Sequence, residues 1–269
     1  MARKRNRAPA GGSSDADVRD RRRRAAHSRV RGWTAWTSPG ACARGMILAI
    51  DSSTAWCSVG AYSAESQLCL AERVWQSGIN HGGELLPAID RVVREAGARR
   101  ESIDLIAVAR GPGTFNGVRV AMATAKGIAL ALGCPIIAVN TLEVHAAAFS
   151  NAGTLVRAML PATRGQVATA LWRADTTFAR IENDALATLD DVLAATTEPT
   201  TIVGEVPHDW IEGLSRAGGL ITLVPVALTR RRPETIARLA RLRAARGDWD
   251  DLESLEPIYL RPPAVTIHR

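Results

Sequence analysis

No apolar run in this sequence of 269 residues reaches the roughly 18 residues that a membrane-spanning helix needs. The four cysteines form no Cys-x-x-Cys pair and no Cys/His cluster with the spacing of zinc ligands. The first 45 residues lack the apolar core of a secretory signal peptide. We therefore expect a cytoplasmic protein without membrane contact. Free thiols are the simplest account of the cysteines, although the sequence leaves a disulfide open.

Positive charge is concentrated at the start of the chain. The sequence has 34 Lys+Arg and 27 Asp+Glu, of which residues 1–45 hold 12 and 3. Residues 46–269 therefore carry 22 basic and 24 acidic side chains, a net charge of −2. The overall net charge of +7 is thus no evidence that the folded part binds nucleic acid.

Residues 1–45 are predicted to be disordered, because they lack the periodic apolar positions that would offset chain entropy. Three interpretations of this basic segment stay open. Translation starts at Met46 and the segment is an extension of the gene model, or it is an inert tail, or it is an arm that contacts RNA.

The rest of the chain alternates strand and helix patterns, and its second half partly repeats the first. Strands are predicted at 46–50, 56–62, 68–75, 104–109, 135–139, 155–160, 166–172, 201–203 and 220–224, and helices at 83–97, 115–132, 141–149, 188–196, 207–217 and 233–246. Such a pair of related units predicts an α/β protein with mixed sheets flanked by helices. It resembles the two-lobed actin-like ATPase fold (ASKHA) of actin, sugar kinases and Hsp70. The expected lobes are 46–150 and 151–269, with a last helix that can pack back on the first lobe.

Two glycine- and hydroxyl-containing turns have the character of phosphate sites. Gly111-Pro112-Gly113-Thr114 lies between a predicted strand and a helix, where free N–H groups and the helix dipole favour an anion. Asp51-Ser52 follows the first strand, where the actin-like fold holds nucleotide phosphates. The candidate residues of a degenerate nucleotide site are Asp51, Ser52, Gly111, Gly113 and Thr114. An ordinary turn, with Thr114 as helix cap, is the alternative.

Five segments together closely resemble the TsaB (YeaZ) family: MILAIDSST (46–54), NHGGELLP (80–87), GPGTFNGVR (111–119), ATAKG (123–127) and PIYLR (257–261). The resemblance extends from residue 46 to about residue 261, and it implies a role in making N6-threonylcarbamoyladenosine (t6A) beside the anticodon of tRNA. It implies a subunit that is not an enzyme on its own and that serves as the dimerisation partner of the transferase TsaD. Recruitment of the ATPase TsaE, homodimer formation and contact with tRNA through the complex are further implications.

Two positions separate this chain from the catalytic sister, which carries two histidines four residues apart. The matching positions here are Thr141 and His145, so the metal-binding pair lacks one ligand. His145 is predicted to be a surface or packing histidine, and no metal is expected. A further departure is Pro161-Ala162-Thr163-Arg164-Gly165-Gln166, where many family members read Asp-Ala-Arg-x-Gly-Glu. The loss of carboxylates at Pro161 and Gln166 and of arginine at Thr163 puts a ligand role of this loop in doubt.

The resemblance also places the partner interface on the helices at 83–97 and 115–132, where small residues allow close helix packing. The residues predicted for it are Leu85, Ile89, Val92, Val118, Met122, Ala123, Ala125 and Lys126. No cofactor is certain, but ATP or ADP at or near this interface is consistent with the two turns. The alternative function is a small-molecule kinase or ATPase of the same fold. Gly204-Glu205 is its only candidate for a second phosphate loop, and it lacks the usual Gly-Gly or Gly-x-Gly pattern.

Overall fold

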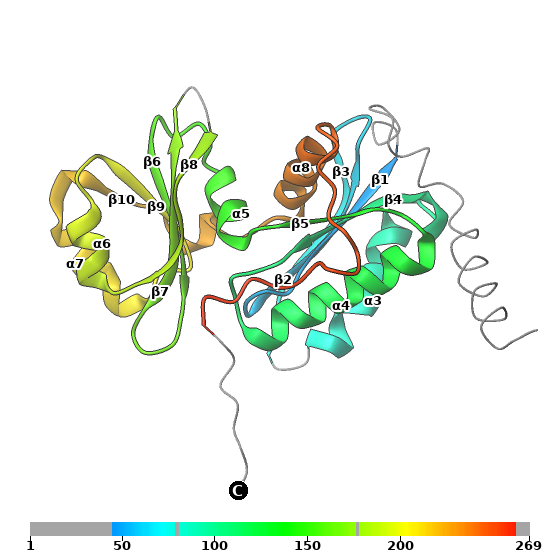
Figure 1. Ribbon diagram of the computed structural model, residues 1–269, viewed down its shortest axis with the longest axis horizontal. Coiled ribbons are helices and arrows are strands. Elements are labelled where there is room, and N and C mark those ends of the chain that lie inside the picture. The colour runs from blue at the N-terminus through cyan, green and yellow to red at the C-terminus, as the bar shows by residue number, and fades with distance from the viewer. Residues whose placement is uncertain (1–44, 79–80, 176–177, 262–269) are drawn as a thin grey trace, which may run out of the picture.

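The computed structural model describes residues 45–78, 81–175 and 178–261, so the predictions for the basic N-terminal segment lie outside the described residues. A five-stranded mixed sheet forms the first lobe, in the order β3-β2-β1-β4-β5 (Figure 1). Its strands are β1 (Met46–Asp51), β2 (Trp56–Ser63), β3 (Cys69–Gln76), β4 (Ile103–Ala109) and β5 (Ile136–Val139).

The second lobe repeats this topology in the order β8-β7-β6-β9-β10. In both sheets the first strand is antiparallel to the second and parallel to the fourth. The strands are β6 (Thr154–Pro161), β7 (Val167–Ala174), β8 (Phe178–Ala187), β9 (Thr200–Gly204) and β10 (Ile221–Leu223). The partial repeat in the sequence is therefore a structural duplication.

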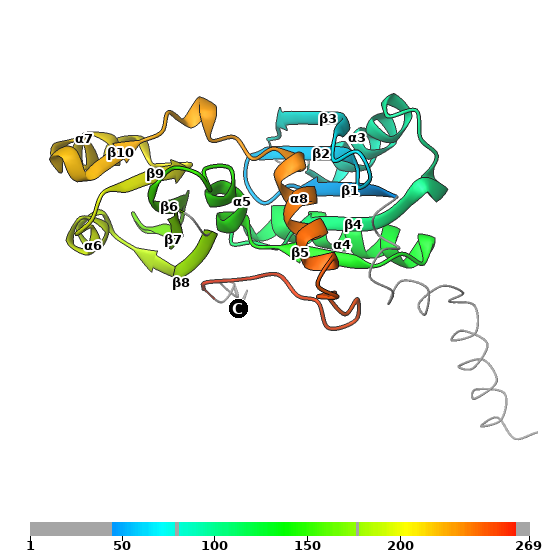
Figure 2. The same ribbon diagram turned by 90° about the horizontal axis from the view of Figure 1, so that it is seen from above.

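Helices cover both faces of each sheet (Figures 1 and 2). The α-helices are α3 (His81–Glu95), α4 (Phe115–Leu132), α5 (Thr141–Ala147), α6 (Leu189–Ala195), α7 (Ile211–Arg216) and α8 (Pro233–Ala244). Short 3₁₀ turns are η2 (Arg100–Ser102), η3 (His208–Trp210), η4 (Gly218–Leu220) and η5 (Val226–Leu228). In the first lobe α3 and α4 pack on one face and α8 on the other, which explains why β1 reads as an unbroken apolar run buried on both sides.

The last helix of each repeat packs on the sheet of the other repeat. Ile236 and Ala240 of α8 are buried against Ile47 of β1, although α8 follows the second sheet in the chain. In α5, which follows the first sheet, Leu142 is buried against Val156 of β6. The two lobes are therefore joined by an exchange of helices as well as by the covalent connections.

A segment without regular structure, residues 251–261, crosses from the first lobe to the second and is here called the C-terminal strap (Figure 1). Lys126 of α4 donates from Nζ to the carbonyl oxygens of Glu253 and Leu255, at 3.3 and 3.1 Å. At the other end, Arg261 Nη1 donates to Thr163 Oγ1 at 2.9 Å. The strap thus binds both lobes along one side of the molecule.

Most predicted elements are confirmed, and α4 has the bounds 115–132 that were expected. Strand β8 was missed, because it is an edge strand whose side chains are mostly exposed or half-buried and whose sequence has no clear apolar alternation. Among the described residues, no helix has the length and apolar content needed to cross a membrane.

Candidate functional site

The two turns predicted as a phosphate site bind each other. Thr114 N donates to Ser53 O at 2.7 Å, and Ser52 Oγ donates to Gly117 O at 2.8 Å. Gly111 N donates to Thr141 Oγ1 at 3.1 Å. Because these N–H groups already have partners inside the protein, Gly111 and Thr114 do not offer them to a phosphate.

Glycines in the turn at Gly111–Thr114 and at the start of α4 allow the two backbones to approach this closely. A Cβ atom on Gly113 would lie 2.2 Å from Ser53 O, and one on Gly117 would lie 2.0 Å from Ser52 O. Gly111 has φ of +100°, and a Cβ atom there would lie 2.7 Å from Ile258 O of the C-terminal strap. Thr114 occupies the N-cap position of α4, but its side chain makes no capping hydrogen bond, so that detail of the prediction is wrong.

The side chain of Arg231 is buried at the junction of the two lobes in front of Asp51, a junction here called the cleft. Its Nε donates to Asp51 Oδ2 at 2.6 Å, and its Nη2 donates to Thr54 Oγ1 at 2.7 Å. Its Nη1 donates to Glu205 Oε1 at 2.8 Å. The side chains of Arg231 and Asp51 are each only 1% exposed. We call Asp51, Thr54, His145, Glu205 and Arg231 the Arg231 cluster.

Asp51 has no free carboxylate oxygen in this arrangement. Its Oδ1 accepts hydrogen bonds from Ser53 N at 2.7 Å and from Ser53 Oγ at 2.6 Å. Its Oδ2 is held by Arg231. A carboxylate so engaged is not available to a cation that accompanies a nucleotide.

His145 lies inside this cluster, so the prediction of a surface position is wrong and the packing alternative describes it. Its Nε2 is 3.0 Å from Arg231 Nη1, and because an arginine only donates, Nε2 is the acceptor and the proton is on Nδ1. Burial lowers the pKa of His145 well below its ordinary value, and the charge of Arg231 lowers it further. The histidine is therefore neutral.

The remaining predicted cleft residues do not complete a metal or phosphate site. Thr141 is buried and its hydroxyl is engaged by Gly111 N. Glu205, in the predicted second phosphate loop, contributes a carboxylate that accepts from Thr54 and Arg231. Throughout residues 45–78, 81–175 and 178–261, no group of three or more His, Cys, Asp or Glu side chains is placed to hold a metal ion.

Sequence reasoning missed Arg231, which organises the cleft. It lies in the run Arg230-Arg231-Arg232 just before α8, and such a run is more often a solvated surface. Its neighbour Arg230 is exposed and stacks over the ring of Trp56 at 4.1 Å. Nothing in the local sequence distinguishes the buried arginine of the three.

Most of the residues predicted for the partner interface lie in the core of the first lobe. Six of them are buried there: Leu85, Ile89, Val92, Val118, Met122 and Ala125. Their helical spacing marks the face that packs on the sheet, so a partner cannot contact them without unfolding the lobe, and this part of the prediction is wrong. Lys126 is half-buried and holds the C-terminal strap. Of the eight residues predicted for the interface, only Ala123 lies on the exposed side of α4.

The outward side of α4 carries a stripe of apolar and small residues, and α3 adds one exposed leucine. On α4, Ala123, Gly127 and Leu130 are exposed at positions i, i+4 and i+7, and Leu130 is 73% exposed. On α3, Leu86 is 56% exposed. These four residues are here called the α3–α4 surface.

Two sheets of identical topology, exchanged end helices and a cleft between them define a two-lobed α/β protein of the actin-like class. Comparison with known proteins gives the family. A family model described as TsaD, tRNA N6-adenosine threonylcarbamoyltransferase, matches residues 76–205. The curated TsaB protein of Bacillus subtilis (strain 168), described as a tRNA threonylcarbamoyladenosine biosynthesis protein, is 30% identical over 80% of this chain and 93% of its own length. The chain belongs to the TsaB family.

Two further relatives agree with this assignment. TsaB of Escherichia coli (strain K12), with the same description, is 29% identical over 80% of this chain and 94% of its own length. The solved structure of YeaZ from Pseudomonas aeruginosa has a TM-score of 0.68 and 26% identity, and covers 80% of this chain and all of its own. The actin-like fold and the family resemblance predicted from the sequence are thereby confirmed.

Proposed function

We propose that this chain is the non-catalytic partner subunit of a TsaD-type transferase in the synthesis of t6A in tRNA. The names of its relatives support the pathway. The match of residues 76–205 to the transferase model supports common descent with the catalytic sister. In this proposal the chain holds the transferase in a productive conformation and helps to recruit TsaE, and tRNA reaches it through the complex.

The observation that carries the proposal is the closed cleft. Arg231 occupies the space in front of Asp51, and the backbone donors of Gly111 and Thr114 are used internally. A cleft filled in this way favours a structural role over phosphate chemistry. ATP or ADP near the interface stays a prediction, and the closed cleft argues against Asp51, Ser52, Gly111, Gly113 and Thr114 as its binding residues.

The α3–α4 surface is the proposed contact with the transferase and the contact in a homodimer. An exposed leucine on each helix, beside small residues on α4, allows helices of a partner to approach closely. Ala123→Arg places a long charged side chain on this surface without entering the core. Ala125→Arg is unsuitable for the purpose, because Ala125 is completely buried.

The test is t6A formation on tRNA in a reconstituted mixture of the adenylate-forming enzyme, TsaD and TsaE, with and without this chain. We expect activity only when both this chain and TsaD are present. Activity without TsaD would make this chain the catalyst, and activity without this chain would contradict the proposal. Intrinsic ATP turnover by the purified chain would instead support the kinase or ATPase alternative.

The interface is tested by co-elution of the chain with TsaD in size-exclusion chromatography. Ala123→Arg is expected to abolish co-elution. Ala217→Arg is the matched control, because it adds the same side chain at an exposed alanine after α7 in the other lobe. Equal co-elution of both variants would rule out the α3–α4 surface as the contact.

A further inference from the structure

A second hollow lies outside the closed cleft, between the start of α4, the β6–β7 turn and the C-terminal strap. Its volume is about 620 Å³, and the residues that line it include Thr114, Phe115, Thr163, Arg164, Tyr259 and Arg261. The Arg231 cluster does not line it. This cavity is therefore separate from the site that Arg231 fills.

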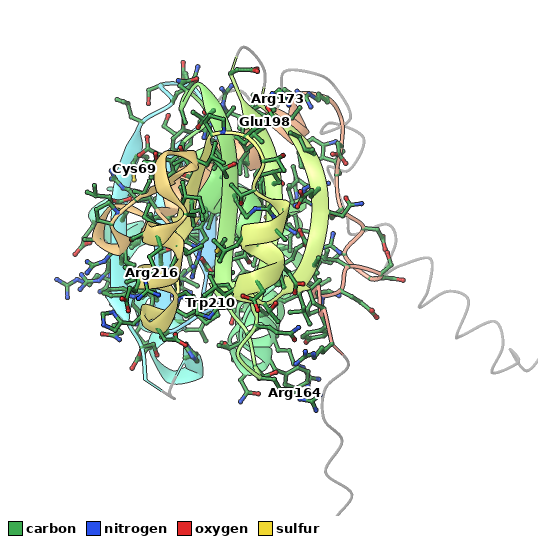
Figure 3. All side chains as sticks on the ribbon, turned by 90° about the vertical axis from the view of Figure 1, so that its left-hand side faces the viewer. Cys69, Arg164, Arg173, Glu198, Trp210 and Arg216 are labelled. Atoms are coloured by element: carbon green, nitrogen blue, oxygen red, sulfur yellow. The ribbon has the colours of Figure 1, made fainter. Side chains whose placement is uncertain are left out.

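The cavity is positively charged. Arg164 and Arg261 line it, and among the described residues of its wall none carries a carboxylate. Arg261 binds neutral acceptors, Thr163 Oγ1 and Gln166 Oε1, so its charge is not neutralised by these contacts. Figure 3 shows Arg164 at the lower edge of the molecule, beside the C-terminal strap. The wall thus favours a ligand with negative charge.

The cavity also presents aromatic rings. The ring centroids of Phe115 and Tyr259 are 5.2 Å apart, and the two residues are 37% and 38% exposed. The guanidinium of Arg119 lies over the ring of Phe115, 4.7 Å from its centroid. Half-exposed rings flanked by arginines are suited to stacking with a planar base.

The loop that departs from the family pattern contributes directly to this chemistry. Pro161 and Gln166 add no charge to this loop, and Thr163 and Gln166 orient Arg261. The carboxylate that acts on this wall is that of Glu256 in the C-terminal strap: burial raises the pKa of Tyr259, and the charge of Glu256 raises it further. An acidic loop in the same place would neutralise the arginines. The uncharged loop therefore leaves the positive charge of Arg164 and Arg261 to attract an anion.

We propose that this cavity binds one nucleotide unit, with its phosphate at Arg164 and Arg261 and its base against Phe115 and Tyr259. Inorganic phosphate alone leaves the rings unused, and an acidic peptide supplies no planar base. The same chemistry is offered by a free nucleotide and by a single-stranded segment of RNA. The RNA source follows from the proposed role in tRNA modification, and the experiment separates the two sources.

The test is fluorescence anisotropy of the full chain with a labelled single-stranded oligoadenylate of about six nucleotides. Competitors are unlabelled AMP, inorganic phosphate and double-stranded RNA of the same length. We expect Arg164→Gln and Phe115→Leu each to weaken binding about tenfold, because one removes a phosphate contact and the other a stacking surface. Arg164→Gln should also lower the salt dependence, with a slope smaller by about one.

Arg216→Gln is the matched control, since it removes one exposed arginine from α7, far from Arg164 on the face seen in Figure 3. Equal weakening by Arg216→Gln and Arg164→Gln, or displacement by inorganic phosphate as effective as by AMP, would overturn the proposal. Binding of AMP without binding of the oligonucleotide would support the cavity and identify a free nucleotide as its ligand. The assay contains no transferase, so its failure is distinct from failure of the proposed partner function.

Discussion

The guanidinium of Arg231 and the carboxylate of Asp51 form a buried ion pair across 180 positions of sequence, with Nε 2.6 Å from Oδ2. Asp51 ends the first strand of the first lobe, and Arg231 lies just before Arg232, the N-cap residue of the helix that returns to that lobe. His145 and Glu205 bind the same guanidinium from α5 and from the end of β9. One side chain thus connects the turn after β1, the exchanged helix and the second sheet.

Arg231→Met should destabilise the protein strongly. The change keeps much of the volume but leaves the carboxylate of Asp51 buried without its counter-charge, which costs about 3–5 kcal/mol. Arg232→Met is the control, because Arg232 pairs with Glu72 at the surface and its loss is expected to cost about 1 kcal/mol or less. Urea unfolding measures both.

The same pair can be tested by a double-mutant cycle. Asp51→Asn combined with Arg231→Met should cost less than the sum of the single changes, since the double variant no longer buries an unpaired carboxylate at position 51. Glu205 loses its partner Arg231 equally in the Arg231→Met and double variants, so this loss cancels in the cycle. Strict additivity of the two effects would show that the ion pair contributes nothing of its own.

Gly117→Ala should destabilise the protein by about 2 kcal/mol or more, because the added Cβ would meet Ser52 O at 2.0 Å. Gly127→Ala on the same helix has no atom within 4 Å of the new Cβ, and it should stabilise the protein by about 0.5–1 kcal/mol through helix propensity. Thermal or urea unfolding of the two variants compares them directly. Similar effects of both changes would contradict the close contact of the two turns.

Neutral, buried His145 should make stability depend on pH in the mildly acidic range. Its pKa in the folded protein is below the ordinary value of 6.5, so below that pH the unfolded chain takes up a proton that the folded chain does not. Stability should therefore fall as pH decreases, with a slope of up to about 1.4 kcal/mol per pH unit.

His145→Gln isolates this contribution, because the amide oxygen can still accept from Arg231 but does not titrate. The difference between the urea-unfolding profiles of the two proteins, from pH 7.5 downward, removes the effect of carboxylates such as Glu143, whose pKa is raised by burial. Parallel profiles would mean that the pKa of His145 is the same in the folded and unfolded states, which contradicts its burial as a neutral group.

Cys57 should resist alkylation although its Sγ lies 3.2 Å from His81 Nδ1. Burial raises the pKa of the thiol to about 12, with further increases from the charges of Asp51 and Glu84, so the pair is not an activated nucleophile. Iodoacetamide labelling followed by peptide mass mapping should show Cys57 reacting more slowly than half-buried Cys69 in the native protein, and equally fast in urea. Faster native labelling of Cys57 would refute this.

Local sequence signals, such as helix caps, predicted the helices and strands that they mark well. The bounds of α4 followed from Thr114 at its N-cap and Gly133 at its C-cap, where φ is +65°. The duplication and the actin-like class followed from the order of such elements. Strand β8 was not predictable in this way, because its partners in the sheet, and not its own pattern, make it a strand.

The functional surfaces were less predictable for two physical reasons. The stripe Val118, Met122 and Ala125 has the spacing of any buried helix face, and periodicity cannot tell whether a sheet or a partner covers it. The arrangement of the cleft depends on Arg231, whose contacts join residues far apart in the chain. No local sequence motif specifies contacts between residues so distant in sequence.

The exchange of α5 and α8 has a consequence for how the protein is made. On the ribosome the first sheet is complete long before α8 emerges, and until then the face that carries Ile47 and Leu105 has no cover. The first sheet of the N-terminal half thus keeps an exposed apolar face until α8, which is synthesised near the end of the chain, can pack on it. A cut between the two halves would therefore yield two incomplete fragments rather than two domains.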